Sequence, residues 1–171
     1  AAQLVREELS DFSLALIGPV TREDKARLIR SINGNGLHGA VQIVDQVDHK
    51  EALRKIADSD ICLCTLSPTI RNYRYAYPIK VFEYMAMGKA VVCTRMDGTQ
   101  RIIQDGKTGL LIAPESPKAV ADAILRLYHD QALRKKIGEN ARQVVTQYDW
   151  KLITIRIGAR LDQLLAAKVT L

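Results

Sequence analysis

The sequence lacks the features typical of membrane proteins, zinc proteins and disulfide-stabilised proteins. No part of its 171 residues approaches the run of about 18 apolar residues that spans a bilayer. It has only three cysteines, an odd number, and none has metal-ligand spacing with a histidine. Because each lies in an apolar run, we expect Cys62, Cys64 and Cys93 to be buried free thiols. We expect no metal and no cofactor.

Internal repeats, low-complexity tracts and a secretory signal are also missing. The opening AAQLVREELSDFSLALIGP has charges before its apolar run and no small-residue cleavage pattern. The expected location is cytoplasmic, with a peripheral position on the inner face of the membrane as a further option. An apolar fraction of 47% and a charged fraction of 26% are typical of a globular protein, and the length fits one domain.

The net charge of +6 is concentrated near the end of the chain, where residues 131–171 hold eight Lys or Arg and three Asp or Glu. Such an excess can bind nucleic acid or anionic lipid. A solvated helical face explains it without either partner, and we favour this interpretation. We expect no nucleic acid partner.

Short apolar runs alternate with helical patterns over the first two thirds of the chain. The runs are continuous rather than alternating, which predicts strands covered on both faces, at 12–18, 41–44, 61–66, 90–94 and 109–113. The helices between them have start signals, namely Thr21, and Asp48 with Glu51 at the capping-box position. This order predicts an α/β fold with a Rossmann-like parallel sheet flanked by helices.

Three helical segments follow the last predicted strand, at about 116–129, 131–147 and 150–168. Ser116 with Pro117 marks the first start, and Asp149 is expected to cap the last helix. The last segment has apolar residues at helical spacing and is expected to pack on the sheet domain or on a neighbour. These residues are Leu152, Ile153, Ile157, Leu161, Leu164 and Leu165.

The stretch GNGLHG at 34–39 matches the dinucleotide-binding pattern GxGxxG by letter only. In that motif the glycines follow a strand and open a helix, so that the pyrophosphate meets the helix N-terminus. Here they close a helix and precede VQIV. We predict a glycine cap and turn instead.

The strongest candidate site is the stretch YPIKVFEYMAMGKAVV at 77–92, which predicts a helix leading into a strand. Pro78 suits the first helical turn, and the amides of Tyr77, Ile79 and Lys80 are left free to hold a phosphate beside the Lys80 charge. One turn on, Glu83 can accept hydrogen bonds from both hydroxyls of a ribose. The alternative is a surface pair between Lys80 and Glu83, and the spacing alone does not separate the two.

The loop SPTIRNYRYAY at 67–77 follows a strand, at the edge of an open parallel sheet where ligands bind. A loop of about 11 residues in a compact domain is often functional. Arg71 and Arg74 could contact phosphate, an acceptor or a membrane. A plain surface role for both is the interpretation we favour.

The sequence resembles the C-terminal, donor-binding domain of GT-B glycosyltransferases of family 4. The resemblance rests on FEYMAMGKAVV, DGKTGLLI and LRKKIGENAR in this order, and extends upstream through LALIGP, VQIVDQV and EALRKIADSDICLCTLSP. It implies that Glu83 is the second glutamate of the family's E-x7-E motif, which holds the ribose. It also implies that Lys80 lies near the diphosphate and that the backbone from Ala76 to Ile79 approaches the donor sugar.

Three departures from the family pattern bear on function. Tyr75 stands where the first glutamate of E-x7-E is expected, and Arg101 replaces the usual glutamate before two isoleucines. The family's opening strand, with its basic loop that grips the diphosphate, and the N-terminal acceptor domain have no counterpart here. We therefore expect residues 1–171 to be one nucleotide-sugar-binding domain of a longer enzyme, with the catalytic residues unidentified.

The resemblance implies a retaining hexosyltransferase, for example a mannosyl- or glucosyltransferase, that uses a UDP- or GDP-sugar to glycosylate a hydroxyl acceptor on a glycan, glycolipid or lipid-linked intermediate. The expected partners are the sugar nucleotide and the acceptor domain, and the isolated domain is expected to be inactive. One alternative is a GT-B-like sugar-nucleotide epimerase. Another is a non-catalytic basic module that binds acidic lipid or nucleic acid.

Overall fold

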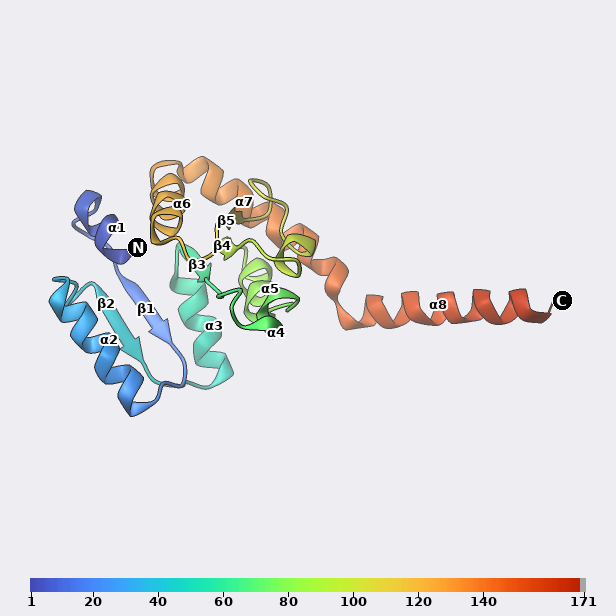
Figure 1. Ribbon diagram of the computed structural model, residues 1–171. Coiled ribbons are helices and arrows are strands. Elements are labelled where there is room, and N and C mark those ends of the chain that lie inside the picture. The colour runs from blue at the N-terminus through green and yellow to red at the C-terminus, as the bar shows by residue number, and fades with distance from the viewer. Residues whose placement is uncertain (170–171) are drawn as a thin grey trace.

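A computed structural model of the chain describes residues 1–169, with side chains as far as Ala166. Strands and helices alternate as predicted and then give way to helices alone (Figure 1). The α/β fold class is therefore confirmed. The elements are α1 (Ala2–Glu8), β1 (Leu14–Ile17), α2 (Arg22–Gly34), β2 (Val41–Val44), α3 (His49–Asp58), β3 (Ile61–Cys64), α4 (Arg71–Arg74), α5 (Ile79–Ala86), β4 (Ala90–Thr94), η1 (Thr99–Arg101), β5 (Leu110–Ile112), α6 (Pro117–His129), α7 (Gln131–Val145), η2 (Thr146–Tyr148) and α8 (Trp150–Val169).

The strands pair only in parallel, but they form two sheets rather than one. β1 pairs with β2, and β3, β4 and β5 form a second sheet in that order. No ladder joins β1 to β3 among the described residues. One edge of each of these two strands therefore has no strand partner in the structure.

The core lies on both faces of β4, all of whose residues are buried. On one face Val91 and Cys93 pack with Val81 and Met85 of α5, and on the other Val92 packs against α6 and α7. Burial of each such aliphatic side chain stabilises the fold by about 1.5–3 kcal/mol. The continuous apolar pattern of β4 thus correctly predicted a strand that is buried on both faces. All three cysteines are buried and free, as expected.

The predicted helix caps are present. Thr21 accepts a hydrogen bond from the amide of Asp24 at 3.1 Å, Asp48 from that of Glu51 at 2.8 Å, and Ser116 from that of Ala119 at 3.2 Å. Asp149 accepts from the amide of Lys151 at 2.7 Å. The carboxylate of Glu51 contacts Arg54 and Lys55, so the reciprocal bond of a capping box is replaced by ion pairs.

The GNGLHG stretch is a turn, as predicted. Helix α2 ends at Gly34, and Gly36 and Gly39 have φ of 65° and 84°, a region that favours glycine. The chain then enters β2, so no helix N-terminus follows these glycines. The dinucleotide alternative therefore lacks the geometry that it requires.

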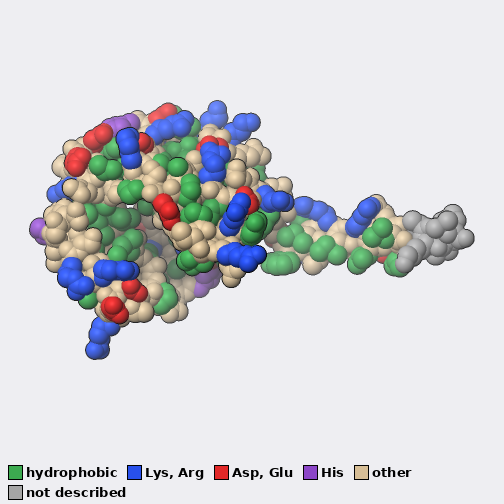
Figure 2. Space-filling model, viewed as in Figure 1, with side chains coloured by type: hydrophobic (Ala, Val, Ile, Leu, Met, Phe, Trp, Pro, Cys, Tyr) green, Lys and Arg blue, Asp and Glu red, His purple; other side chains and the backbone are tan. Residues whose placement is uncertain are grey.

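The last helix, α8, projects away from the rest of the molecule (Figure 1). It was expected to pack on the sheet domain or on a neighbour. It does not pack on the sheet domain, because among the described residues its contacts are chiefly with η2 just before it, and packing on a neighbour stays a prediction. Figure 2 shows hydrophobic side chains along one side of this helix and basic ones along another. Trp150 is 75% exposed and Ile155 65%. No described helix is long and apolar enough to cross a membrane.

Candidate functional site

The candidate residues lie in the segment that leaves the carboxyl end of β3 and leads into α5. In parallel sheets the segments after the strands gather at one edge, which is where ligands bind. Ser67, in this segment, donates a hydrogen bond to the Glu115 carboxylate at 2.8 Å, and Glu115 follows the end of β5. Glu115 has a φ of 53°, rare for a residue with a side chain.

Helix α5 begins at Ile79, with Pro78 as its N-cap at φ −65° and ψ 120°. The proline is therefore one residue outside the helix, not in its first turn as predicted. The amide of Val81 bonds to the carbonyl of Pro78 at 2.9 Å, whereas those of Tyr77, Ile79 and Lys80 have no described acceptor. Unpaired amides at the positive end of a helix favour a bound anion.

The buried side of α5 determines where its polar residues point. Val81 and Met85 are fully buried in the core, so Lys80 and Glu83 lie on the opposite side of the helix. Lys80 is exposed, and the Glu83 side chain is 28% exposed. The described ion pairs do not include one between Lys80 and Glu83, so the surface-pair alternative has no support in the structure.

Glu83 is paired with His49, at the start of α3, with 3.6 Å between Oε1 and Nδ1. The His49 side chain is 72% exposed. No sequence pattern connects His49 with Glu83, since the two are 34 positions apart and the contact depends on where α3 lies. The pairing brings the segment after β2 next to the start of α5.

Lys80 lies close to the ends of β3 and β4. The hydrogen bond between the two buried thiols there lowers the pKa of Cys64 and raises that of Cys93, and burial further raises the latter. The Lys80 charge lowers the pKa of both thiols to a smaller extent. The positive charge of Lys80 therefore acts on groups at the carboxyl ends of β3 and β4, where the site was predicted.

The loop before α5 is attached to the segment after β4. Arg74 donates to the Asp97 carboxylate at 3.0 Å, and that hydrogen bond raises the pKa of Arg74. The amide of Gly98 donates to the carbonyl of Arg74 at 3.0 Å. A Cβ on Gly98 would lie 2.2 Å from the carbonyl oxygen of Ala76, so only glycine fits there. Sequence reasoning missed Asp97 and Gly98, because no recognisable short sequence pattern marks either residue.

Tyr75 and Tyr77 are 60% and 48% exposed, and Ile79 is 75% exposed. The guanidinium of Arg74 lies 5.7 Å from the centre of the Tyr75 ring, within cation–π range. The predicted site residues are thus gathered on one exposed stretch, with Glu83 one helical turn beyond it. Arg74 is bound to a carboxylate of its own chain, and its role in donor binding stays a prediction.

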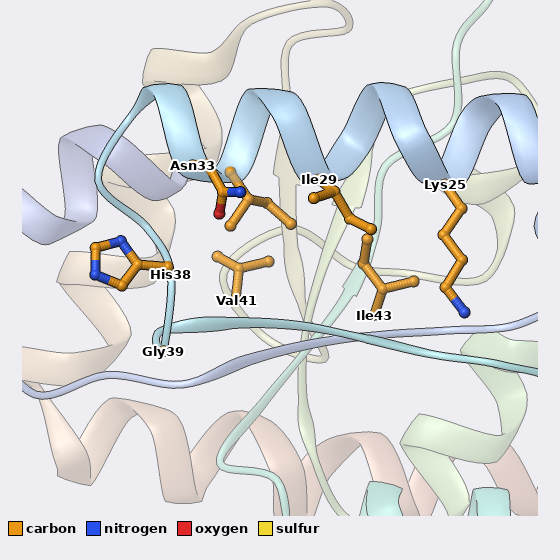
Figure 3. A pocket seen from close by; sticks show the side chains of 8 residues that line it. Lys25, Ile29, Asn33, His38, Gly39, Val41 and Ile43 are labelled. Carbon is orange, nitrogen blue, oxygen red and sulfur yellow. The ribbon is translucent and has the colours of Figure 1, made fainter.

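Two hollows in the structure lie elsewhere. One of about 300 Å³ separates α2 from β2 and is lined by Ile29, Val41 and Ile43, with Lys25 and His38 at its ends (Figure 3). The other, of about 450 Å³, lies beside the amino end of β4. Neither is lined by a predicted site residue. Among the described residues no group of His, Cys, Asp or Glu side chains could hold a metal ion.

The family model for glycosyl transferases group 1 matches residues 1–144. A phosphatidyl-myo-inositol mannosyltransferase of Mycobacterium leprae is 29% identical over 153 residues, which are 90% of this chain and 38% of that protein. An uncharacterized glycosyltransferase of Methanocaldococcus jannaschii is 28% identical over 75% of this chain and 32% of its own length. The chain thus spans about a third of the length of these relatives.

A solved structure of similar fold is the C-terminal domain of the glycosyl transferase group 1 family protein LpcC from Francisella tularensis. The TM-score is 0.75 at 26% identity, over 85% of this chain and 74% of that one. HepE from Anabaena, solved in complex with UDP, has a TM-score of 0.77 at 18% identity, over 97% of this chain and 44% of its own. The chain therefore belongs to the glycosyl transferases group 1 family and has the fold of the C-terminal half of a GT-B enzyme.

Proposed function

We propose that this domain binds the sugar-nucleotide donor of a retaining hexosyltransferase that glycosylates a hydroxyl acceptor. The observation that carries the proposal is the start of α5, where unpaired amides, the Lys80 charge and the Glu83 carboxylate lie within one helical turn of one another. Phosphate groups suit the first two features and a ribose suits the third. Among the relatives, the Mycobacterium leprae protein is named as a mannosyltransferase.

In this proposal the domain acts on the leaving group. Negative charge develops on the diphosphate as the bond to the sugar breaks, and the helix N-terminus together with Lys80 stabilises it. Glu83 accepts the ribose hydroxyls and so fixes the nucleotide along α5. UDP and GDP share these groups, and both are candidate donors.

We further propose that the domain works with an acceptor-binding domain that lies outside residues 1–171. Chains of the relatives are about three times as long as the matched region. The exposed apolar side of α8, which includes Ile157 and Leu161, is a surface that such a domain can cover. The isolated domain is then expected to bind nucleotide and to turn over little donor.

Calorimetric titration of the chain with UDP and with GDP tests the proposal. We expect saturable binding of one of them, and we expect Glu83→Gln to weaken it about tenfold or more, because a carboxylate acceptor of two hydroxyls is lost. Glu139→Gln is the matched control, since Glu139 is an exposed helical carboxylate paired with a lysine.

Binding that Glu83→Gln leaves unchanged would contradict the assignment of the site. The same chain should also be mixed with vesicles that contain anionic lipid. Salt-sensitive attachment to vesicles without any response to nucleotide would favour the basic-module alternative, in which the Lys and Arg residues of α8 bind the membrane surface.

A further inference from the structure

The hollow of about 450 Å³ lies at the end of the central sheet opposite to the candidate donor site. Ala90, the first residue of β4, lines it, whereas the candidate site lies at the carboxyl ends of β3 and β4. Gly88 and Lys89, which connect α5 to β4, also line the hollow, as do Gln131 and Ala132 at the start of α7. The hollow therefore shares no residue with the site proposed to bind nucleotide.

The charge that lines this hollow is mainly positive. Lys89, Arg134 and Lys135 line it, and Asp60 is the only acidic residue among the described residues that do so. Asp60 is 78% exposed and its carboxylate lies 3.4 Å from the Arg134 guanidinium, an exposed ion pair of a kind that contributes little to stability. The lining residues therefore leave an excess of positive charge without a partner in the hollow.

Two of the three cations are held in place by the protein. Lys89 donates a hydrogen bond through Nζ to the carbonyl of Ala57. Burial raises the pKa of the nearby Cys62 thiol, and the Lys89 charge lowers it to a smaller extent. The Arg134 side chain is only 23% exposed. Side chains that are already fixed lose less conformational freedom on binding a ligand than free surface side chains do.

Uncharged donors line the same hollow. The amides of Gln131 and Ala132 have no acceptor among the described residues, and the amide of Leu133 donates to the capping carboxylate of Asp130 at 2.8 Å. Asp130 itself does not line the hollow. A phosphate group has several oxygens that accept charge-assisted hydrogen bonds at once, so it suits cations and amides gathered in one place.

We propose that this hollow binds a small soluble molecule through a phosphate group. The guanidinium of Arg134 and the ammonium groups of Lys89 and Lys135 contact the phosphate oxygens, and Arg134 gives up its exposed contact with Asp60. The volume lies within the range of about 300–1,000 Å³ that is typical of small-molecule pockets, so there is space for the rest of the ligand. The proposal does not depend on nucleotide binding at α5.

NMR titration of the nitrogen-15-labelled 171-residue chain with inorganic phosphate tests the proposal, with sodium chloride added to keep the ionic strength constant. We expect saturable shifts of the amide signals of Lys89, Gln131 and Ala132, with one half-saturation concentration. The amides of Lys80 and Glu83 report separately on the candidate donor site. Shifts at the hollow that do not saturate, or that sodium chloride alone produces, overturn the proposal.

Substitutions at neighbouring positions of α7 separate a specific site from general charge. Lys135→Gln removes a cation that lines the hollow, and Lys136→Gln removes an exposed cation that does not. Both variants change the net charge equally. We expect Lys135→Gln to weaken phosphate binding at the hollow about tenfold and Lys136→Gln to weaken it less than twofold. Equal weakening by the two variants refutes the proposal.

Vesicles that contain phosphatidic acid test whether the phosphate group belongs to a lipid instead, because that headgroup is a phosphomonoester. We expect Lys135→Gln and Lys136→Gln to change attachment to these vesicles by the same small factor, since each removes one positive charge. Attachment that Lys135→Gln reduces about tenfold and Lys136→Gln leaves unchanged would assign the hollow to a lipid headgroup and overturn the proposal.

Discussion

Replacement of Gly98 by alanine should disturb the loop that leads into the candidate site. The backbone of Gly98 has φ −71° and ψ −48°, values that alanine adopts without strain. The effect of Gly98→Ala is therefore purely steric. The added methyl would lie 2.2 Å from the oxygen of Ala76 and 2.8 Å from the carbonyl carbon of Tyr75, and both are backbone atoms that cannot rotate away.

The contact can be relieved only if the two segments separate by more than 1 Å, since ordinary contacts begin near 3.4 Å. That movement breaks the bond from the Gly98 amide to Arg74 and the ion pair of Arg74 with Asp97. Overpacking of this kind costs about 1–3 kcal/mol. For a domain of this size the melting temperature should fall by about 2–12 °C, which thermal unfolding followed by circular dichroism measures.

Gly34→Ala is the matched control, because Gly34 lies in α2 and an added Cβ there meets nothing within 4 Å. It should leave the melting temperature unchanged or raise it slightly, since alanine is the better helix former. If Gly98→Ala is no less stable than Gly34→Ala, the close approach of the two loops is wrong. Nucleotide affinity should fall with Gly98→Ala and not with Gly34→Ala.

Three further predictions concern other parts of the fold. Gly138→Ala should destabilise the domain by about 1–3 kcal/mol in urea unfolding, because its Cβ would lie 2.1 Å from the carbonyl oxygen of Gly88 where α7 crosses the end of α5. Partial burial opposes ionisation of Asp105, but hydrogen bonds from the Leu111 amide and from Arg95 prevail and hold its pKa below the usual 3.8. The ionised Asp105 therefore stabilises the fold above pH 3.8, and this stabilisation is lost as the pH falls through the lower pKa of the folded state. Wild type should be more stable than Asp105→Asn by about 1 kcal/mol at neutral pH. In denaturant unfolding this difference should shrink between about pH 5 and pH 3. Burial raises the pKa of Cys62 to about 11, so a thiol reagent at neutral pH should label it only after unfolding.

Local patterns predicted the elements of this fold well. The five apolar runs became the five strands, and the caps at Thr21, Asp48, Ser116 and Asp149 are where the sequence placed them. These features depend on residues within a few positions of one another, and each carries its own chemical signature. The cap of α7 by Asp130 was missed although its signature is the same.

The candidate site was predicted only in part, because much of it depends on distant contacts. The free amides of α5 follow from the helix start alone, which a proline and the apolar spacing indicate. The contact of His49 with Glu83 and the fit of Gly98 against Ala76 depend on the relative position of separate elements. No spacing in the sequence encodes those positions, because they arise only when the separate elements pack together.

The two predictions of packing that differ from the structure have one physical explanation. A parallel sheet was expected to be continuous and α8 was expected to be covered, since apolar residues such as Leu16 and Leu161 were assumed to be buried. Both are exposed, at 37% and 54%. Contiguous exposed apolar surface is a common mark of a contact with another part of a protein. Apolar patterning predicted burial for both residues, and nothing among the described residues buries them. The spacing of apolar residues shows which side chains suit burial, but it does not show which group covers them.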